Sequence, residues 1–367
     1  MTGNMEPGIT HWSREVYEKQ LCSMMEEAGF PIFWYGSFKK YNAPETGFVP
    51  DTFDPRYSQG YAAAHNRLGL LIENHIYKPY RQRVEATIEA ILASAKILAQ
   101  NKEQLQEVVA AADAYISSAA SREEPFGFNY RSTYETVIMK DYLSWGRDTT
   151  ISDLSGGEWV THDYTDPITL NIPVYTSFKA TSSVKIPKAY ILMPQWKNVI
   201  ELLDLHGIKY SVLEEPAAVE VETYRYRGGK FSSRQSEGRI PVTPDFTVQT
   251  ETLEYPSGSI YIDMDQPASR VAMWMLEPAA PGSLTYWGFF NVCVQAGNEF
   301  WIRPQYMEVK GREMLAKDPQ LKAQFEEKLR TDAEFAGNPQ AILNFFYQIV
   351  RKRSHQNNEL HPAWRVM

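Results

Sequence analysis

The stretch Gly60–Arg83, GYAAAHNRLGLLIENHIYKPYRQR, decides the fold that we expect for the N-terminal part of this chain. Its apolar residues between 68 and 72 predict a short strand of the kind found inside an α/β sheet. Ligands of such folds collect outside the carboxyl ends of the strands, and Glu73 follows at that end. Spacing alone leaves two interpretations of Glu73, a functional carboxylate or a structural ion pair with Arg67, Lys78 or Arg81.

An overlapping segment, NRLGLLIENHIYKPYRQRVEAT at residues 66–87, carries a family resemblance. It resembles the C-terminal part of the catalytic domain in a bacterial subgroup of the zinc carboxypeptidase (carboxypeptidase A-like) family. Three downstream phrases resemble the accessory domain of those proteins: SVKIPKAYILMPQWKNVIELLDLHGIKY, EGRIPV and MLEPAAPGSLTYWGFFN. The resemblance implies that Glu73 is the general base, that zinc is the cofactor and that peptides are the substrates. It also implies a periplasmic or extracellular location for full-length relatives.

The zinc ligands that the resemblance requires are missing from the sequence. The family holds its metal with a His-x-x-Glu pair and a third His, all upstream of the catalytic Glu, because a catalytic zinc takes three protein ligands and one water. None of the seven histidines is followed at the third position by Glu, and only His11 and His65 precede Glu73. We therefore expect an N-terminally truncated chain without a complete zinc site, inactive alone; a misassigned start, a split gene or a cloned fragment would each explain it.

Several residues near Glu73 are candidates for substrate binding. By resemblance, a loop tyrosine closes over the substrate, and Tyr57 is the first choice, with Tyr61 second. Arg67 or Arg81 could hold the C-terminal carboxylate of a peptide, since an Arg fork binds a carboxylate in bidentate fashion. Two more candidates flank the predicted strand and could line a cleft, namely Asn66 and His75. For each of these residues a purely structural role is the alternative.

Composition excludes some other classes of protein. The net charge of −8 over 367 residues argues against nucleic-acid binding, which requires a basic patch. No apolar run reaches the length of a membrane span, and no signal peptide is recognised, so the chain as written is expected in the cytoplasm. Cys22 and Cys293 lack metal or redox spacing, and we expect both in the core.

The chain divides into three expected parts, an α/β fold followed by a β-rich region and C-terminal helices. Residues 1–120 are assigned to the C-terminal portion of a carboxypeptidase-like mixed-sheet domain. Residues 121–300 are assigned to a β-rich accessory domain with a small βαβ unit near 189–213, and residues 301–367 to a helical segment. A second hypothesis makes residues 120–300 a non-enzymatic binding or scaffold module for peptide or glycan, with a degenerate peptidase-like half kept only for its fold. Exposed aromatic side chains would favour that hypothesis, and buried ones a structural domain.

Local patterns predict the individual elements. Apolar spacing indicates one helix over residues 10–28 and another over 82–119, which should cover a sheet and could break near Lys102. β-branched and aromatic residues predict strands over 122–187, and period-two alternation predicts a sandwich-like module over 217–295. The pairs Asp318-Pro319 and Asn338-Pro339 each place a cap residue before a proline at the start of a helix.

Overall fold

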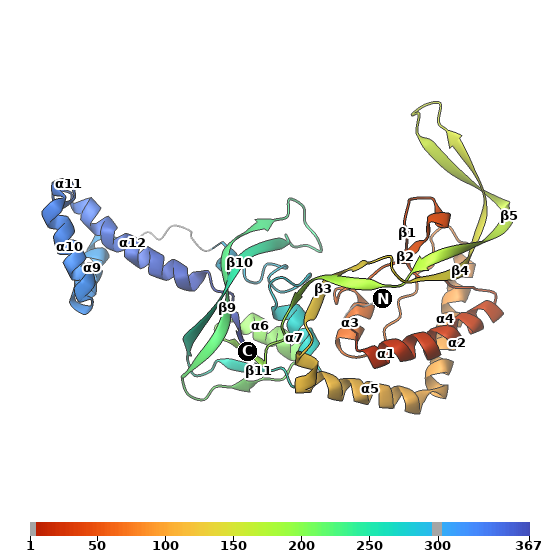
Figure 1. Cartoon of the computed structure of the whole chain (residues 1–367), viewed down its shortest axis with the longest axis horizontal. Helices are drawn as coiled ribbons and strands as arrows, with labels where there is room; N and C mark the ends of the chain where they lie inside the picture. The colour runs from red at the N-terminus through yellow and green to blue at the C-terminus, as the bar shows by residue number, and fades with distance from the viewer. Residues whose placement is uncertain (1–4, 296–302) are drawn as a thin grey trace.

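A computed structural model describes residues 5–295 and 303–367 (Figure 1). Within these residues the chain is a mixed α/β protein with three sheets and a group of C-terminal helices, which confirms the expected fold class. Figure 1 shows the N-terminal helices at one end of the molecule, the largest sheet in the middle and the C-terminal helices at the other end. No helix in the described part of the chain is long and apolar enough to cross a bilayer.

The N-terminal helix is confirmed and begins three residues before the predicted start. It comprises α1 (Pro7–Trp12), a π-helical turn (Ser13–Glu18) and α2 (Lys19–Glu27). Glu6 caps the first turn by accepting a hydrogen bond from the Ile9 N–H at 3.0 Å. Leu21 and Met25 of α2 pack against a later helix, α4, and this contact forms a small core of its own.

The predicted long helix is present as two helices, α4 (Tyr80–Gln100) and α5 (Lys102–Ile116), and the expected break falls at Asn101. The expectation that its apolar stripe covers a sheet is wrong. The buried positions of α4 are mostly alanines that face α2, namely Ala86, Ala90, Ala93 and Ile97. Apart from Ile97, most of the larger apolar residues of α4 are exposed: Val84, Ile88, Ile91, Leu92 and Leu98.

The strand predicted for residues 68–72 is also wrong. This segment is irregular, and it connects a short helix, α3 (Ser58–Ala64), to α4. Leu68 is half-buried, and the other leucines and the isoleucine are exposed, with 47% of Leu70, 47% of Leu71 and 37% of Ile72 accessible to solvent. A strand exists only through hydrogen bonds to a neighbouring strand. No strand of the described residues pairs with this segment, so its strand-forming sequence remains without a sheet.

The strands predicted over residues 122–187 are confirmed. β4 (Val137–Ile151) and β5 (Glu158–Tyr175) form a long hairpin that extends away from the body of the molecule (Figure 1). Together with β1 (Gly36–Phe38) and β2 (Phe48–Pro50) they make a sheet in the order β1-β2-β5-β4. A separate pair is formed by β3 (Phe126–Ser132) and β6 (Phe178–Val184).

The central sheet has six strands in the order β10-β9-β12-β7-β11-β8. The predicted βαβ unit is confirmed as β7 (Ala189–Leu192), α6 (Lys197–Leu205) and β8 (Ser211–Val212). The remaining strands and a second helix are β9 (Ala217–Phe231), β10 (Val242–Tyr255), β11 (Ile260–Asp263), β12 (Ala363–Val366) and α7 (Ser269–Leu276). The expected sandwich is wrong, because the largest core lies between this sheet and the helices α6 and α7.

The C-terminal helices are confirmed, but the chain does not end in a helix. α8 (Asn291–Val294) is followed by α9 (Pro304–Lys317), α10 (Pro319–Thr331), α11 (Ala333–Ala336) and α12 (Pro339–Asn358). Both predicted caps are present, since Asp318 accepts from the Leu321 N–H at 3.0 Å and Asn338 from the Ala341 N–H at 3.1 Å. The segment after α12 returns to the central sheet as β12, between β9 and β7.

Candidate functional site

Glu73 lies in the irregular segment before α4, and its side chain is exposed. Its neighbour Asn74 anchors the segment by donating from Nδ2 to Thr87 Oγ1 at 2.8 Å. Among residues 5–295 and 303–367, no hydrogen bond or ion pair to the Glu73 carboxylate is found. The ion-pair interpretation of Glu73 is therefore wrong. The carboxylate is available to solvent or to another molecule.

Arg67 and Asn66 both bind Asp113 on α5. The Arg67 guanidinium makes a bidentate contact with Asp113, with two nitrogen to oxygen distances of 2.9 Å. The Asn66 amide is fully buried and donates to Asp113 Oδ1 at 3.0 Å and to the Pro267 carbonyl at 3.3 Å. The structure thus places these two candidates at a junction between α3, α5 and the segment before α7, with the Arg67 fork already occupied. The other candidate cation, Arg81, contacts Glu85 at 2.6 Å.

His75 and the two candidate tyrosines lie in different surroundings. His75 is exposed, and its Nδ1 accepts a hydrogen bond from the Tyr77 N–H at 3.3 Å. Tyr61 is bound through its hydroxyl to His206 Nδ1 at 2.8 Å. Tyr57 accepts from the Arg56 guanidinium at 2.5 Å and packs edge-on against Phe53, with ring centroids 5.2 Å apart. Tyr57 is the candidate that lies beside a pocket, because the Phe53 ring that it contacts belongs to a residue that lines this pocket.

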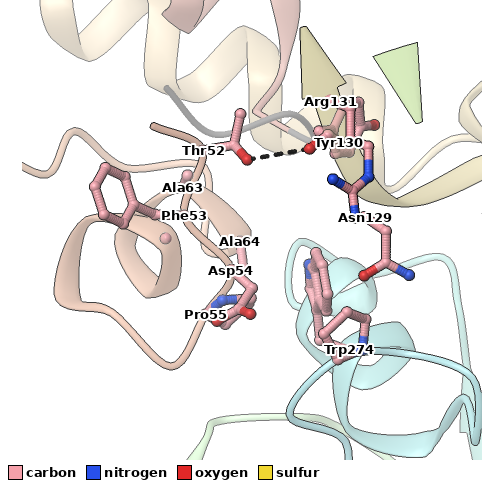
Figure 2. A pocket seen from close by; sticks show the side chains of 12 residues that line it. Thr52, Phe53, Asp54, Pro55, Ala63, Ala64, Asn129, Tyr130, Arg131 and Trp274 are labelled. Atoms are coloured by element: carbon pink, nitrogen blue, oxygen red, sulfur yellow. Dashed lines mark hydrogen bonds between the residues drawn. The ribbon is translucent and has the colours of Figure 1, made fainter. Parts of the chain in front are cut away.

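This pocket has a volume of about 270 Å³ and lies where the 52–55 loop and α3 meet β3 and α7 (Figure 2). Gly60 on α3 permits the close approach of the loop, because a Cβ at this position would lie 2.1 Å from the Asp54 carbonyl oxygen. On the opposite wall, the Trp274 ring is fixed by edge-on contacts to Phe126 and Phe128 at 5.7 and 5.3 Å. The pocket is therefore built from a loop and a rigid core.

The pocket carries one charged group of each sign. Burial raises the pKa of the Asp54 carboxyl, while the Arg56 N–H, which donates to it at 3.2 Å, acts in the opposite direction. Arg131 lines the other side, beside Asn129 (Figure 2). The sequence patterns missed both walls of this pocket. Nothing in those patterns linked the 52–55 loop to β3 or α7.

The described residues do not fit a zinc site. Within the part of the chain that the structure describes, no group of three or more His, Cys, Asp or Glu side chains is arranged to hold a metal ion. His65 and His206 lie on either side of Tyr61, with ring centroids 4.6 and 5.5 Å from it, but they bring no carboxylate with them. Burial also lowers the pKa of both imidazoles. A catalytic zinc needs three ligands in one place.

Comparison with curated proteins indicates a carboxypeptidase relationship. Carboxypeptidase 2 of Trichophyton tonsurans is 24% identical over 116 residues, which is 32% of this chain and 21% of that protein. Carboxypeptidase 2 of Trichophyton equinum and of Trichophyton rubrum match with the same identity and coverage. The chain thus spans about a fifth of the length of these relatives, and because they are fungal they do not support the bacterial subgroup. No model of a known protein family matches, and no solved structure matches.

Proposed function

We propose that this chain is part of a carboxypeptidase-type peptidase, to which it contributes Glu73 as general base. The distant similarity to carboxypeptidase 2 supports the reaction class. In this role the Glu73 carboxylate takes a proton from the attacking water and passes it to the leaving amine of the peptide. The exposed position of Glu73 leaves its carboxylate accessible to the zinc ligands and substrate-binding groups that would complete the site.

The observation that carries this proposal is the exposed apolar surface next to Glu73. Asn74 also donates to the Arg83 carbonyl at 3.4 Å, which holds the irregular segment against the start of α4. Segment and helix together expose ten large apolar side chains: Leu70, Leu71, Ile72, Ile76, Tyr77, Tyr80, Val84, Ile88, Ile91 and Leu92. Exposed apolar surface of this extent marks an interaction site. We propose that further polypeptide covers it and supplies the zinc ligands, so that the chain alone is inactive.

Two measurements test this proposal. Purified chain should neither bind stoichiometric zinc nor release C-terminal residues from a peptide, and chelator-sensitive trimming by the chain alone would contradict the need for further polypeptide. The DNA upstream of Met1 should encode a His-x-x-Glu pair and a later His, in frame or after a frameshift. Once joined to that segment, the protein should lose about 10²- to 10⁴-fold in rate on Glu73→Gln. Glu85→Gln is the matched control, and equal activity of the two variants would exclude Glu73 as the base.

A second function, the binding of peptide or glycan by the β-rich region, is favoured by exposed aromatic residues on the β4–β5 hairpin. The exposed fractions are 38% for Trp145, 59% for Trp159 and 72% for Tyr164. Trp145 and Tyr164 lie edge-on, with centroids 5.8 Å apart, and so form a small aromatic surface. Titration of the chain with peptide and oligosaccharide panels should reveal binding that Trp145→Ala removes. Binding that survives Trp145→Ala would exclude this aromatic surface as the site.

A further inference from the structure

The pocket in Figure 2 is separate from the surface around Glu73 and has a distinct chemistry. Asp54 belongs to the loop that forms one wall, and Arg131 belongs to β3, which forms the facing wall. The two side chains are not within ion-pair distance of each other, and in residues 5–295 and 303–367 no ion pair of the Arg131 guanidinium is found. A gap between opposite charges leaves room for a ligand that carries both.

The hydrogen bonds of these two groups leave capacity for such a ligand. Asp54 uses one oxygen to accept from the Arg56 N–H at 3.2 Å. A carboxylate has about four acceptor positions, so others stay open. Guanidinium groups donate up to five hydrogen bonds in a planar fork that matches a carboxylate. Asn129 adds an amide at the same wall (Figure 2).

The pocket is small, and apart from Thr52 and Tyr130 its other lining residues are apolar or glycine. Phe53 and Pro55 line the loop side, and Trp274 and Pro281 line the opposite side. Trp274 is 8% exposed, so a ligand would meet the part of the ring that is still accessible. A volume of about 270 Å³ lies just below the range of small-molecule pockets, which begins at roughly 300 Å³. This size suits a single amino-acid unit.

We propose that this pocket binds an α-carboxylate unit with an apolar side chain, as presented by a free amino acid or by the C-terminus of a peptide. Arg131 holds the carboxylate, Asp54 accepts from the adjacent ammonium or amide N–H, and Pro55 and Trp274 contact the side chain. The inference does not rest on a catalytic role for Glu73, which does not line the pocket.

Calorimetric titration of the full chain tests this inference with three probes: phenylalanine, glycyl-phenylalanine and phenylalaninamide. Both carboxylates should bind and the amide should not. Arg131→Met should weaken binding by about tenfold or more, because charge-assisted hydrogen bonds are lost. Arg131→Lys should retain part of the affinity, and the exposed residue Arg234 supplies the matched control, Arg234→Met.

Asp54→Asn distinguishes the two sources of the ligand. If the free amino acid is the ligand, this variant should weaken phenylalanine binding more than glycyl-phenylalanine binding, since only the former places an ammonium beside Asp54. The reverse order supports the peptide C-terminus. Absence of binding by both carboxylates, or unchanged affinity of a folded Arg131→Met variant, overturns the inference. Loss of binding on Glu73→Gln also overturns it, because the ligand would then occupy the proposed peptidase site instead.

Discussion

The guanidinium of Arg365 lies 3.3 Å from the carboxylate of Glu277, and the two side chains are 5% and 0% exposed. Tyr224 also donates to Glu277, at 2.6 Å, as does the hydroxyl of Tyr190. Removal of one partner from a buried ion pair leaves an uncompensated charge, at a cost of about 3–5 kcal/mol. We therefore expect Arg365→Met to lower the free energy of unfolding by about this amount, as measured by urea denaturation.

The double variant Arg365→Met with Glu277→Gln provides the control for this prediction. It removes both charges, so it should be more stable than Arg365→Met alone, although the hydrogen bonds of Glu277 are altered. If the two substitutions are simply additive, the interaction between Arg365 and Glu277 contributes nothing. The side chain of Arg365 then stabilises the position of β12 through its ion pair with Glu222 and its hydrogen bond to the Tyr224 hydroxyl at 2.8 Å, in addition to the backbone pairing.

Because His361 is buried, we expect the folded protein to lose stability in acid. Its Nδ1 lies 2.7 Å from the Tyr226 hydroxyl and its Nε2 2.7 Å from the Leu276 carbonyl, so Nε2 carries the proton and Nδ1 accepts. Burial lowers the pKa of His361 to about 3. In the unfolded chain the pKa is about 6.5. Between these two pKa values only the unfolded chain takes up the proton. The contribution of neutral His361 to the free energy of unfolding is therefore complete above about pH 6.5. It declines, by up to about 1.4 kcal/mol per pH unit, towards pH 3.

A comparison of wild type with His361→Gln isolates this effect. Glu277 has the opposite effect on the pH dependence of stability, because burial raises the pKa of its carboxyl. Its contribution to the free energy of unfolding therefore decreases as the pH rises above the pKa of this carboxyl in the unfolded chain. Since both proteins contain Glu277, its effect cancels in the difference between their free energies of unfolding. That difference should be largest near neutral pH and shrink between about pH 6.5 and pH 3. A constant difference would show that His361 is not held neutral.

The parts of the fold that sequence predicted depend on local interactions. The caps at Asp318 and Asn338 and the α6 helix follow from residues a few positions apart. The strand at 68–72 failed because a strand needs a neighbour, and the apolar pattern carries no information on whether one is present. β12 was missed because its four residues give little periodic signal and its place is set by β7 and β9.

The candidate site, too, could be predicted from the sequence only where it depends on local pattern. Local pattern and resemblance drew attention to Glu73, and the structure places it on an accessible surface. The partner of Arg67, however, is Asp113, which lies 46 residues further along the chain on another helix. The pocket beside Tyr57 likewise joins a loop, β3 and α7. Contacts between segments so far apart arise from tertiary packing, which single-sequence patterns do not encode.

Gly60 should be intolerant of a side chain. A Cβ at this position would lie 2.1 Å from the Asp54 carbonyl oxygen and 2.5 Å from its carbon, so the loop would have to move away from α3. We expect Gly60→Ala to lower the free energy of unfolding by about 1–3 kcal/mol. Gly157→Ala is the control, since its new Cβ would meet only the Ser155 hydroxyl, at 3.2 Å. Equal stability of the two variants would mean that the 52–55 loop adapts freely.

The two faces of α4 should respond differently to charge. Ile91 and Leu92 are each 58% exposed, whereas Ile97 is fully buried against α2. We expect Ile91→Lys and Leu92→Lys each to change the free energy of unfolding by no more than about 0.5 kcal/mol. Ile97→Lys should cost several-fold more, because it buries an unpaired ammonium. Thermal or urea unfolding measures these differences.

Dye binding provides a second reading on the same variants. The exposed side chains of α4 should bind a hydrophobic dye in the purified chain, and Ile91→Lys with Leu92→Lys should reduce that fluorescence without loss of helicity. If these substitutions instead destabilise the chain as strongly as Ile97→Lys does, the Ile91 face is already covered in the purified protein. The surface next to Glu73 would then not be available to further polypeptide, and the proposed completion of the peptidase site would lose its structural basis.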